Sequence, residues 1–180
     1  LFALGFSKDK IIETFYTINK YSFDKENNNW TTEFNLENYK RPLKLSYDLI
    51  DAKNNKKVLN KGEKINIVIA KKLKEKGLNE IAIPNEQIVG KYIGKEIKNK
   101  NGEIIVGAGF DITEEQLEKV ISQEEKVLHL VNIDPINKGP YILESLKIDK
   151  NTNKTEALND IYKVLRPGEA PSVEISEEIF

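Results

Sequence analysis

The fold is decided most clearly at residues 109–117, which read GFDITEEQL. Thr113 and Gln116 have the spacing of a capping box, in which the two side chains satisfy free backbone N–H groups at the start of a helix. Ile112 and Leu117 flank them as a hydrophobic staple, which fixes the angle at which the chain enters the helix. The stretch therefore predicts a helix that begins just after Thr113 and follows an extended segment.

The same pattern occurs about 47 residues earlier, which indicates an internal repeat. Ile65 matches Ile112, Gly62 matches Gly109, and Asn66 takes the position of the helix cap. Each copy predicts the order strand, turn, strand, glycine, isoleucine, helix, strand. We therefore expect two copies of one small β-rich module.

The repeat lies in the middle of a chain whose predicted fold class is α+β. We place the modules at about residues 45–90 and 91–133, so that residues 45–133 form one insertion. Residues 1–44 and 134–180 then form a second, discontinuous unit of mixed helical and β structure.

Several further elements are predicted on either side of the repeat. Ser7 caps a helix through Phe15, and alternating apolar residues indicate strands over residues 30–36 and 43–49. Near the end of the chain, Thr155 caps a helix with an apolar stripe, and Ser172 caps another. The stripe consists of Leu158, Ile161, Tyr162 and Leu165. Pro167 ends the first of these helices, because proline disfavours helical geometry in the residue before it.

Composition excludes several functional classes. The 180 residues contain no cysteine and one histidine, which excludes a disulfide framework, thiolate metal sites and multi-histidine centres. Basic and acidic residues number 28 and 29, so bulk charge does not hold the chain on nucleic acid. No uncharged run approaches the roughly 20 residues that span a membrane, and we expect a cytoplasmic protein. The absence of methionine leads us to expect a segment of a larger protein.

Charge is distributed unevenly between the two copies of the repeat. One explanation is a surface with a basic and an acidic part, which docks a protein partner or positions nucleic acid. The simpler explanation is that both charge runs are solvated helix faces. The basic residues of the first copy are Lys53, Lys56, Lys57, Lys61, Lys64, Lys71, Lys72, Lys74 and Lys76. The acidic residues of the second are Asp111, Glu114, Glu115, Glu118, Glu124 and Glu125.

Two further features invite a catalytic or cofactor-binding interpretation that we do not favour. Gly107 and Gly109 precede a helix as in a dinucleotide-binding motif, but the third glycine of that motif is replaced by Ile112. A structural turn is therefore the better interpretation. His129 lies in an apolar strand pattern and is expected to be a partly buried strand residue.

The corner at residues 166–169 (RPGE) is the best candidate for a binding function. Arg166 is one of only two arginines, and Lys163 and Glu169 lie close to it in the sequence. Arginine suits bidentate contacts to phosphates or bases. The alternative is that Arg166 caps the carbonyl groups of its own helix.

This corner also belongs to a series of motifs that resemble the beta subunit of bacterial DNA-directed RNA polymerase. The motifs are LFALGF at residues 1–6, GPYI at 139–142, ALNDIY at 157–162 and RPGE at 166–169. Phe2, Lys138 and Ala170 depart from the residues usual in that family. The middle of the chain resembles an insertion that some bacterial lineages carry in this region.

The resemblance implies that the chain is the lobe (domain 2) of this subunit, with the lineage-specific insertion at residues 45–133. It implies a non-catalytic part of a nucleotidyltransferase, which lines the downstream-DNA cleft while another subunit holds the catalytic magnesium. The implied partners are the beta', alpha and sigma subunits, promoter and downstream DNA, and secondary-channel regulators that dock on the insertion.

Within this interpretation, Arg166, Lys163 and Glu169 are the residues expected to contact DNA or a regulator. The fragment itself is expected to hold no cofactor and no catalytic residue. The alternative interpretation is a stand-alone nucleotide-binding or interaction domain.

Overall fold

A computed structural model describes residues 1–123, 126–133 and 139–179. The helices of this part are α1 (Lys8–Phe15), α2 (Ile67–Glu75), α3 (Glu114–Ile121), α4 (Tyr141–Ile148), α5 (Lys154–Leu165) and α6 (Val173–Ile179). The strands are β1 (Ile18–Asp24), β2 (Asn29–Glu33), β3 (Leu43–Lys44), β4 (Leu49–Asp51), β5 (Lys56–Leu59), β6 (Lys64–Ile65), β7 (Glu80–Ile83), β8 (Ile97–Lys98), β9 (Ile104–Val106) and β10 (Val127–Val131). The predicted α+β class is confirmed.

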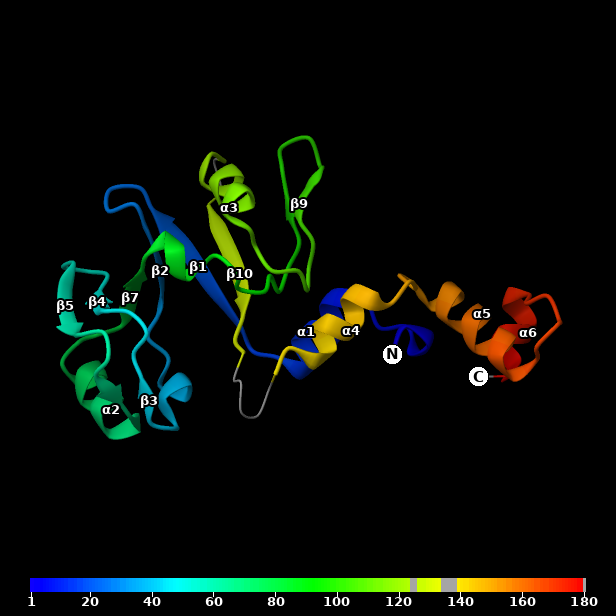
Figure 1. The fold of residues 1–180 in the computed structure, drawn as a ribbon, viewed down its shortest axis with the longest axis horizontal. Coiled ribbons are helices and arrows are strands. Elements are labelled where there is room, and N and C mark those ends of the chain that lie inside the picture. Colours follow the sequence, from blue (N-terminus) through cyan, green and yellow to red (C-terminus); the bar gives the residue numbers. More distant parts are fainter. Residues whose placement is uncertain (124–125, 134–138, 180) are drawn as a thin grey trace.

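The described part is elongated and has two regions (Figure 1). All ten strands, with α2 and α3, form a β-rich body at one end. Helices α1 and α4 pack together in the middle, and α5 and α6 pack together at the other end. None of the described helices has the length and apolar character needed to cross a membrane.

One antiparallel sheet organises the body, with the strand order β10-β1-β2-β7-β4-β5. The hairpins β3–β6 and β8–β9 lie outside it as two small sheets. Side chains from β2, β7 and β10 meet helices α2 and α3 in a continuous apolar core. At its centre Trp30 is fully buried and packs edge-on against Phe23, with ring centroids 5.1 Å apart.

The predicted helix starts of the repeat are confirmed. Thr113 and Gln116 form the capping box of α3, and Asn66 accepts a hydrogen bond from the backbone N–H of Ile69 at the start of α2. Gly62 and Gly109 have φ values of +89° and +83°, in the region that favours glycine. The element order of the two copies therefore agrees.

Two separate inserted modules are nevertheless not confirmed. Strands β7 and β10, which close the two copies, both pair with the hairpin β1–β2, on opposite sides of it. The hairpin of the first copy, β4–β5, joins the same sheet through β7, whereas β8–β9 does not. Backbone pairing thus merges the copies and the preceding hairpin into one unit, and the sheet crosses the predicted boundary at residue 44.

The points where the chain enters and leaves the body lie side by side. The backbone N–H of Asn132 donates to the carbonyl of Thr17 at 2.8 Å. Gly94 approaches Ile18 so closely that a Cβ atom there would lie 2.8 Å from its side chain. The chain therefore enters and leaves the body at adjacent points.

Some predicted elements need correction. Residues 43–49 do not form one strand: β3 and β4 are separated by a bend, and Leu43 is partly exposed while Leu45 and Leu49 are buried. Asn153, not Thr155, caps α5 by accepting a hydrogen bond from the N–H of Glu156 at 3.0 Å. The predicted caps at Ser7 and Ser172 are confirmed.

Candidate functional site

The corner between α5 and α6 is built by a sharp change of backbone direction. Helix α5 ends at Leu165, as Pro167 predicts, and the N–H of Arg166 still donates to the carbonyl of Tyr162 at 2.8 Å. Gly168 has a φ of +93°, a conformation that costs a residue with a side chain about 1–2 kcal/mol. Arg166 is therefore held at the first position beyond a regular helix and remains exposed.

Arg166 and Glu169 are brought together at this corner. A guanidinium nitrogen of Arg166 lies 3.6 Å from Oε2 of Glu169, and both side chains are more than half exposed. The hydroxyl of Tyr162 donates to the same Oε2 at 2.7 Å. Glu169 thus anchors the corner to the buried Tyr162, and the guanidinium faces this carboxylate rather than any described helix carbonyl.

Hydrogen bonding shifts the pKa values of Tyr162 and Glu169 in opposite directions. The hydrogen bond to Glu169 is the main cause that raises the pKa of Tyr162. The same bond, with a smaller contribution from the Arg166 charge, lowers the pKa of Glu169. Glu169 is therefore ionised at neutral pH and partly balances Arg166.

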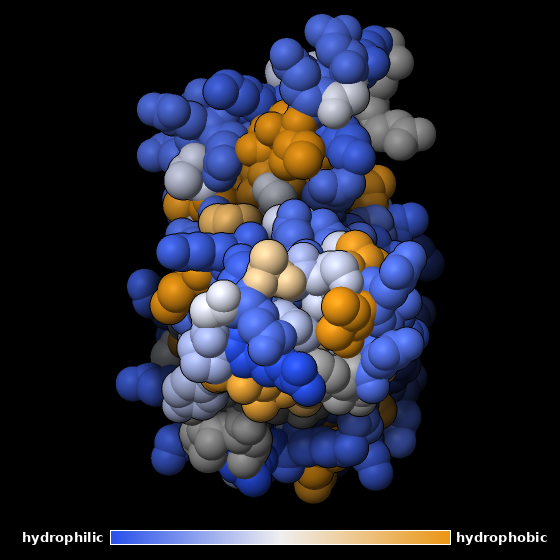
Figure 2. Space-filling view, turned by 90° about the vertical axis from the view of Figure 1, so that its right-hand side faces the viewer, coloured by the Kyte–Doolittle hydropathy of each residue, from blue (hydrophilic) through white to orange (hydrophobic). Residues whose placement is uncertain are grey.

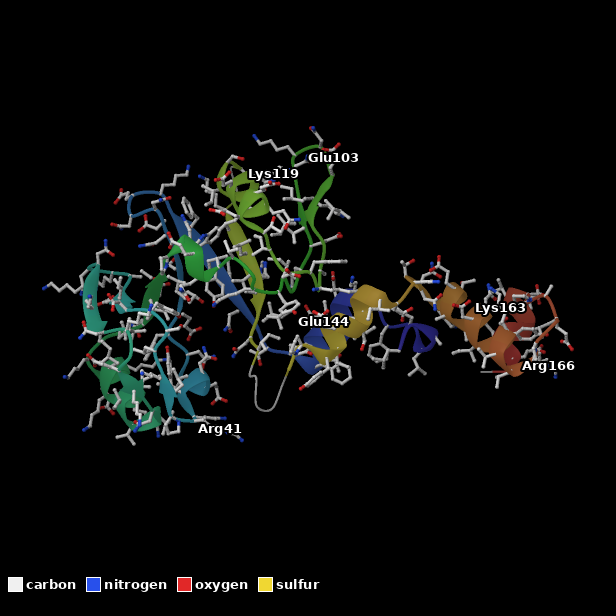
Figure 3. The ribbon with its side chains drawn as sticks, viewed as in Figure 1. Arg41, Glu103, Lys119, Glu144, Lys163 and Arg166 are labelled. Atoms are coloured by element: carbon white, nitrogen blue, oxygen red, sulfur yellow. The ribbon has the colours of Figure 1, made fainter. Side chains whose placement is uncertain are left out.

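The third predicted residue, Lys163, lies on α5 one turn before the corner. Its Nζ is 3.5 Å from Oδ1 of Asp160, and no described contact joins it to Arg166. Figure 3 shows Lys163 and Arg166 at the same α5–α6 end of the molecule. This geometry places two exposed cations at one end of the described part of the chain.

The outer surface of this region is mixed in character. Figure 2 faces this end of the molecule and shows apolar patches between hydrophilic ones. Val164 on α5 is 81% exposed, and a groove of about 420 Å³ runs between α5 and the 3-10 helix η1 (Phe2–Leu4). Such a surface is typical of a region that packs against other parts of an assembly.

Sequence patterns alone missed a polar junction between the body and the helical region. The junction cluster consists of Tyr92, Asp111, Glu144 and Lys147. The hydroxyl of Tyr92 donates to Oε1 of Glu144 at 2.6 Å, and Nζ of Lys147 donates to Asp111 at 2.7 Å and to Glu144 at 3.1 Å. The ammonium also lies 4.7 Å from the centroid of the Tyr92 ring. The contacts of Tyr92 with Glu144 and of Asp111 with Lys147 join residues far apart in the sequence, so no local pattern reveals them.

Charges in the junction cluster shift one another's pKa values. Hydrogen bonds from Tyr92 and then Lys147 lower the pKa of Glu144, and the hydrogen bond from Lys147 lowers that of Asp111. Burial acts to lower the pKa of Lys147, but its hydrogen bonds to Asp111 and Glu144 outweigh that effect and raise it. The hydrogen bond to Glu144 is the main cause that raises the pKa of Tyr92, which stays a neutral donor. The cluster therefore holds α4 against the body through one cation, two carboxylates and one neutral hydroxyl.

The Gly107–Gly109 turn packs against the helical region. A Cβ atom on Gly109 would lie 3.4 Å from Lys8 and 3.5 Å from Ile12, so the turn packs directly on α1. Ala108 within the turn is also buried. The predicted structural turn is confirmed.

His129 also has the predicted environment. It lies half-buried on β10, and burial, with smaller contributions from Lys95 and Lys20, lowers its pKa. Among the described residues there is no group of three or more histidine or acidic side chains that could hold a metal ion. Glu124, Glu125 and Lys138 lie outside the described residues.

Comparisons with known proteins define the class of the chain. No family model matches it. The chain is 33% identical over 181 residues to the DNA-directed RNA polymerase subunit beta of Caulobacter vibrioides, and 35% identical over 181 residues to that of Rhizobium leguminosarum bv. trifolii. It is 38% identical over 180 residues to the corresponding subunit of Ehrlichia canis. The matches cover 99–100% of this chain and 13% of each of these relatives.

Over its whole length the chain is therefore similar to one segment of a large polymerase subunit. The resemblance to the beta subunit of bacterial DNA-directed RNA polymerase is confirmed, and it extends over the whole chain. The chain spans about 13% of the length of the curated relatives that it matches.

Proposed function

We propose that the chain forms the lobe of an RNA polymerase beta subunit, a non-catalytic jaw beside downstream DNA. The observation that carries this proposal is the similarity of the complete chain to one segment of the beta subunits. Arg166 supports it, because an exposed guanidinium on a conformationally fixed corner suits a contact to phosphate. In this role Arg166 makes the contact, Glu169 orients it, and Lys163 adds charge nearby.

The lobe acts within a larger assembly under this proposal. Its partners are the beta', alpha and sigma subunits, promoter and downstream DNA, and regulators of the secondary channel, all in the cytoplasm. The lobe holds no cofactor, and another subunit holds the magnesium that nucleotidyl transfer requires. The exposed apolar surface around Val164 fits this role, because such a surface is suited to neighbouring protein.

The β-rich body is proposed to be the insertion on which regulators dock. Because Thr17 and Asn132 are hydrogen-bonded neighbours, the chain enters and leaves the body at adjacent points, and we move the proposed boundaries from 45–133 to residues 18–131. Deleting residues 45–133 would remove β7 and β10, the partners of β1 and β2. That deletion would expose Trp30, which is fully buried in the intact body.

Arg166→Ala in the assembled polymerase tests the lobe assignment. We expect the promoter open complex to dissociate about fivefold faster, the effect of about 1 kcal/mol in one exposed charged contact. Arg166→Lys should retain more of the open-complex lifetime than Arg166→Ala, because lysine keeps the charge but lacks the planar guanidinium that makes bidentate contacts. Lys150→Ala, an exposed cation without a described ion pair, is the matched control. Unchanged lifetime and unchanged regulator response in Arg166→Ala would contradict the assignment.

Excision of the body tests the docking role. A short Gly-Ser linker would join Thr17 to Asn132 in place of residues 18–131. We expect RNA synthesis on a promoter-free nicked template to persist and the response to a secondary-channel regulator to be abolished. Complete loss of synthesis, or a fully retained response, would count against this role.

A further inference from the structure

The net charge of the chain conceals a strong local excess of positive charge. Residues 40–76 contain twelve lysine or arginine side chains and four aspartate or glutamate side chains, although the net charge of the whole chain is −1. The near-neutral total therefore does not describe the electrostatics of the surface. What matters is where the structure places these cations.

The fold gathers many of them at one end of the body. Strands β3 and β6 pair so that Lys44 lies directly opposite Lys64. Helix α2 packs against the 3-10 helix η2 (Leu36–Tyr39), and Arg41 follows η2 closely. We call this surface the basic end. It consists of Arg41, Lys44, Lys64, Lys71, Lys72 and Lys76, all of which are exposed.

The basic end lies far from the corner that carries Arg166. Figure 3 shows Arg41 beside the region of β3 and α2, at the opposite end of the molecule from Arg166. The two are separated by the whole length of the helical region. The basic end is therefore a surface distinct from the proposed lobe contact.

The cations of the basic end have few anionic partners within the chain. Neighbouring lysines outside this set do form ion pairs, as Lys57 does with Asp48 at 2.6 Å and Lys74 with Glu33 at 3.9 Å. No ion pair joins a member of the basic end to any acidic side chain in residues 1–123, 126–133 or 139–179.

Two pairs of these cations occupy positions in which like charges repel each other. Like charges directly opposite in a strand pair are destabilising, as for Lys44 and Lys64. Lysines four residues apart on a helix repel similarly, as for Lys72 and Lys76 at the end of α2. An external polyanion would relieve this repulsion.

The residues around the basic end favour nucleic acid over a protein partner. Protein interfaces depend on a core of buried aromatic or aliphatic anchors. The large hydrophobic side chains exposed between residues 40 and 76 are Leu43, at 36%, and Val68, at 56%. Lysines spread over two strands and a helix, with so little apolar surface, fit a phosphate backbone.

We propose that the basic end binds the phosphate backbone of nucleic acid without reading its sequence. Binding is electrostatic and falls steeply with salt, because each neutralised phosphate releases counterions. The expected affinity is that of sequence-independent binding, with a Kd of roughly 10⁻⁴–10⁻⁶ M at physiological salt. This function does not depend on the proposed lobe contact of Arg166.

The test compares two quadruple variants of the full 180-residue chain that remove the same charge. The first carries Lys44→Gln, Lys64→Gln, Lys71→Gln and Lys72→Gln. The control carries Lys10→Gln, Lys25→Gln, Lys119→Gln and Lys150→Gln, which change exposed lysines elsewhere. Circular dichroism melting verifies that both fold. Fluorescence anisotropy then follows binding to a labelled duplex of about 30 base pairs between about 25 and 150 mM salt, because log K falls linearly with log salt when phosphates are neutralised.

We expect the basic-end variant to bind at least about tenfold more weakly than wild type at low salt, and the control to bind nearly as wild type. The slope of log K against log salt should become shallower by about 0.9 for each phosphate that the variant no longer neutralises. Equal weakening in both variants, or no binding by wild type, would overturn the proposal. Tighter binding of wild type to poly-glutamate than to the duplex would instead indicate an acidic protein partner and would also overturn it. Neither result bears on the open-complex test of Arg166.

Discussion

The β-rich body and the helical region differ in how completely they bury their apolar side chains. The body encloses a continuous core in which Trp30 and Phe34 are fully buried. The helical region has one small cluster of its own and shares a second with Ala108 and Val131 of the body. It leaves Tyr141 75% and Val164 81% exposed. The body thus has the features of a self-sufficient unit, whereas the helical region has those of a part that is completed by its neighbours. The predictions below test this difference, beginning with the largest effect.

Removing the central side chain of the body should produce the largest loss of stability. Trp30→Ala leaves a cavity in a fully enclosed core and is expected to reduce the free energy of unfolding by about 3–5 kcal/mol. Val164→Ala in the helical region should change it by less than about 0.5 kcal/mol, because the side chain is exposed. Urea unfolding followed by circular dichroism measures both. Equal losses would show that the two regions do not differ as described.

The corner between α5 and α6 should respond locally to a backbone change. Gly168→Ala puts a side chain at a φ of +93° and should cost about 1–2 kcal/mol. Hydrogen exchange is expected to become faster in α5 and α6 and to stay unchanged in β1, β2 and β10. Ala170→Gly, in the same exposed loop, is the control. Faster exchange throughout the sheet would indicate that the regions unfold together.

Weakening the junction cluster should cost less stability than the two changes above. Tyr92→Phe removes the hydroxyl that donates to Glu144, at an expected cost of about 1 kcal/mol. Tyr141→Phe serves as the control because that side chain is largely exposed and its hydroxyl has no described partner. Thermal melting at neutral pH gives the comparison. A loss in Tyr141→Phe as large as that in Tyr92→Phe would argue against a specific connection.

The smallest expected effect is the pH dependence of the same junction. The pKa values of Glu144 and Asp111 are lowered in the folded chain from 4.5 and 3.8. Their stabilising effect is thus complete above these values and is lost as the pH falls through the lowered pKa values. NMR titration should place the pKa of Glu144 below 4.5, and Tyr92→Phe should raise it. A Glu144 pKa that is the same in both proteins would contradict the described hydrogen bond.

Local rules account for the elements that the sequence predicted correctly. Capping at Ser7, Asn66 and Thr113 depends only on residues within one turn, so spacing alone identified these helix starts. The strand β1 was missed because its residues, INKYSFD, lack clear alternation. Helix α4 was missed because no capping side chain precedes it: its first residue follows Pro140. Of the candidate site, the Arg166 corner was predicted, but the hydrogen bond from Tyr162 to Glu169 was not.

The sequence by itself determined the α+β class, the starts of α1, α2, α3 and α6, the turn at Gly109 and the resemblance to the polymerase beta subunit. These properties depend on short spacings, residue types and motifs. Only the tertiary structure decided that β7 and β10 join one sheet through β1 and β2, and that Thr17 meets Asn132. It also decided that Lys44 faces Lys64 and that Lys147 bridges two regions. The physical reason is that strand pairing and ion pairing join residues far apart in the chain, where local periodicity carries no information.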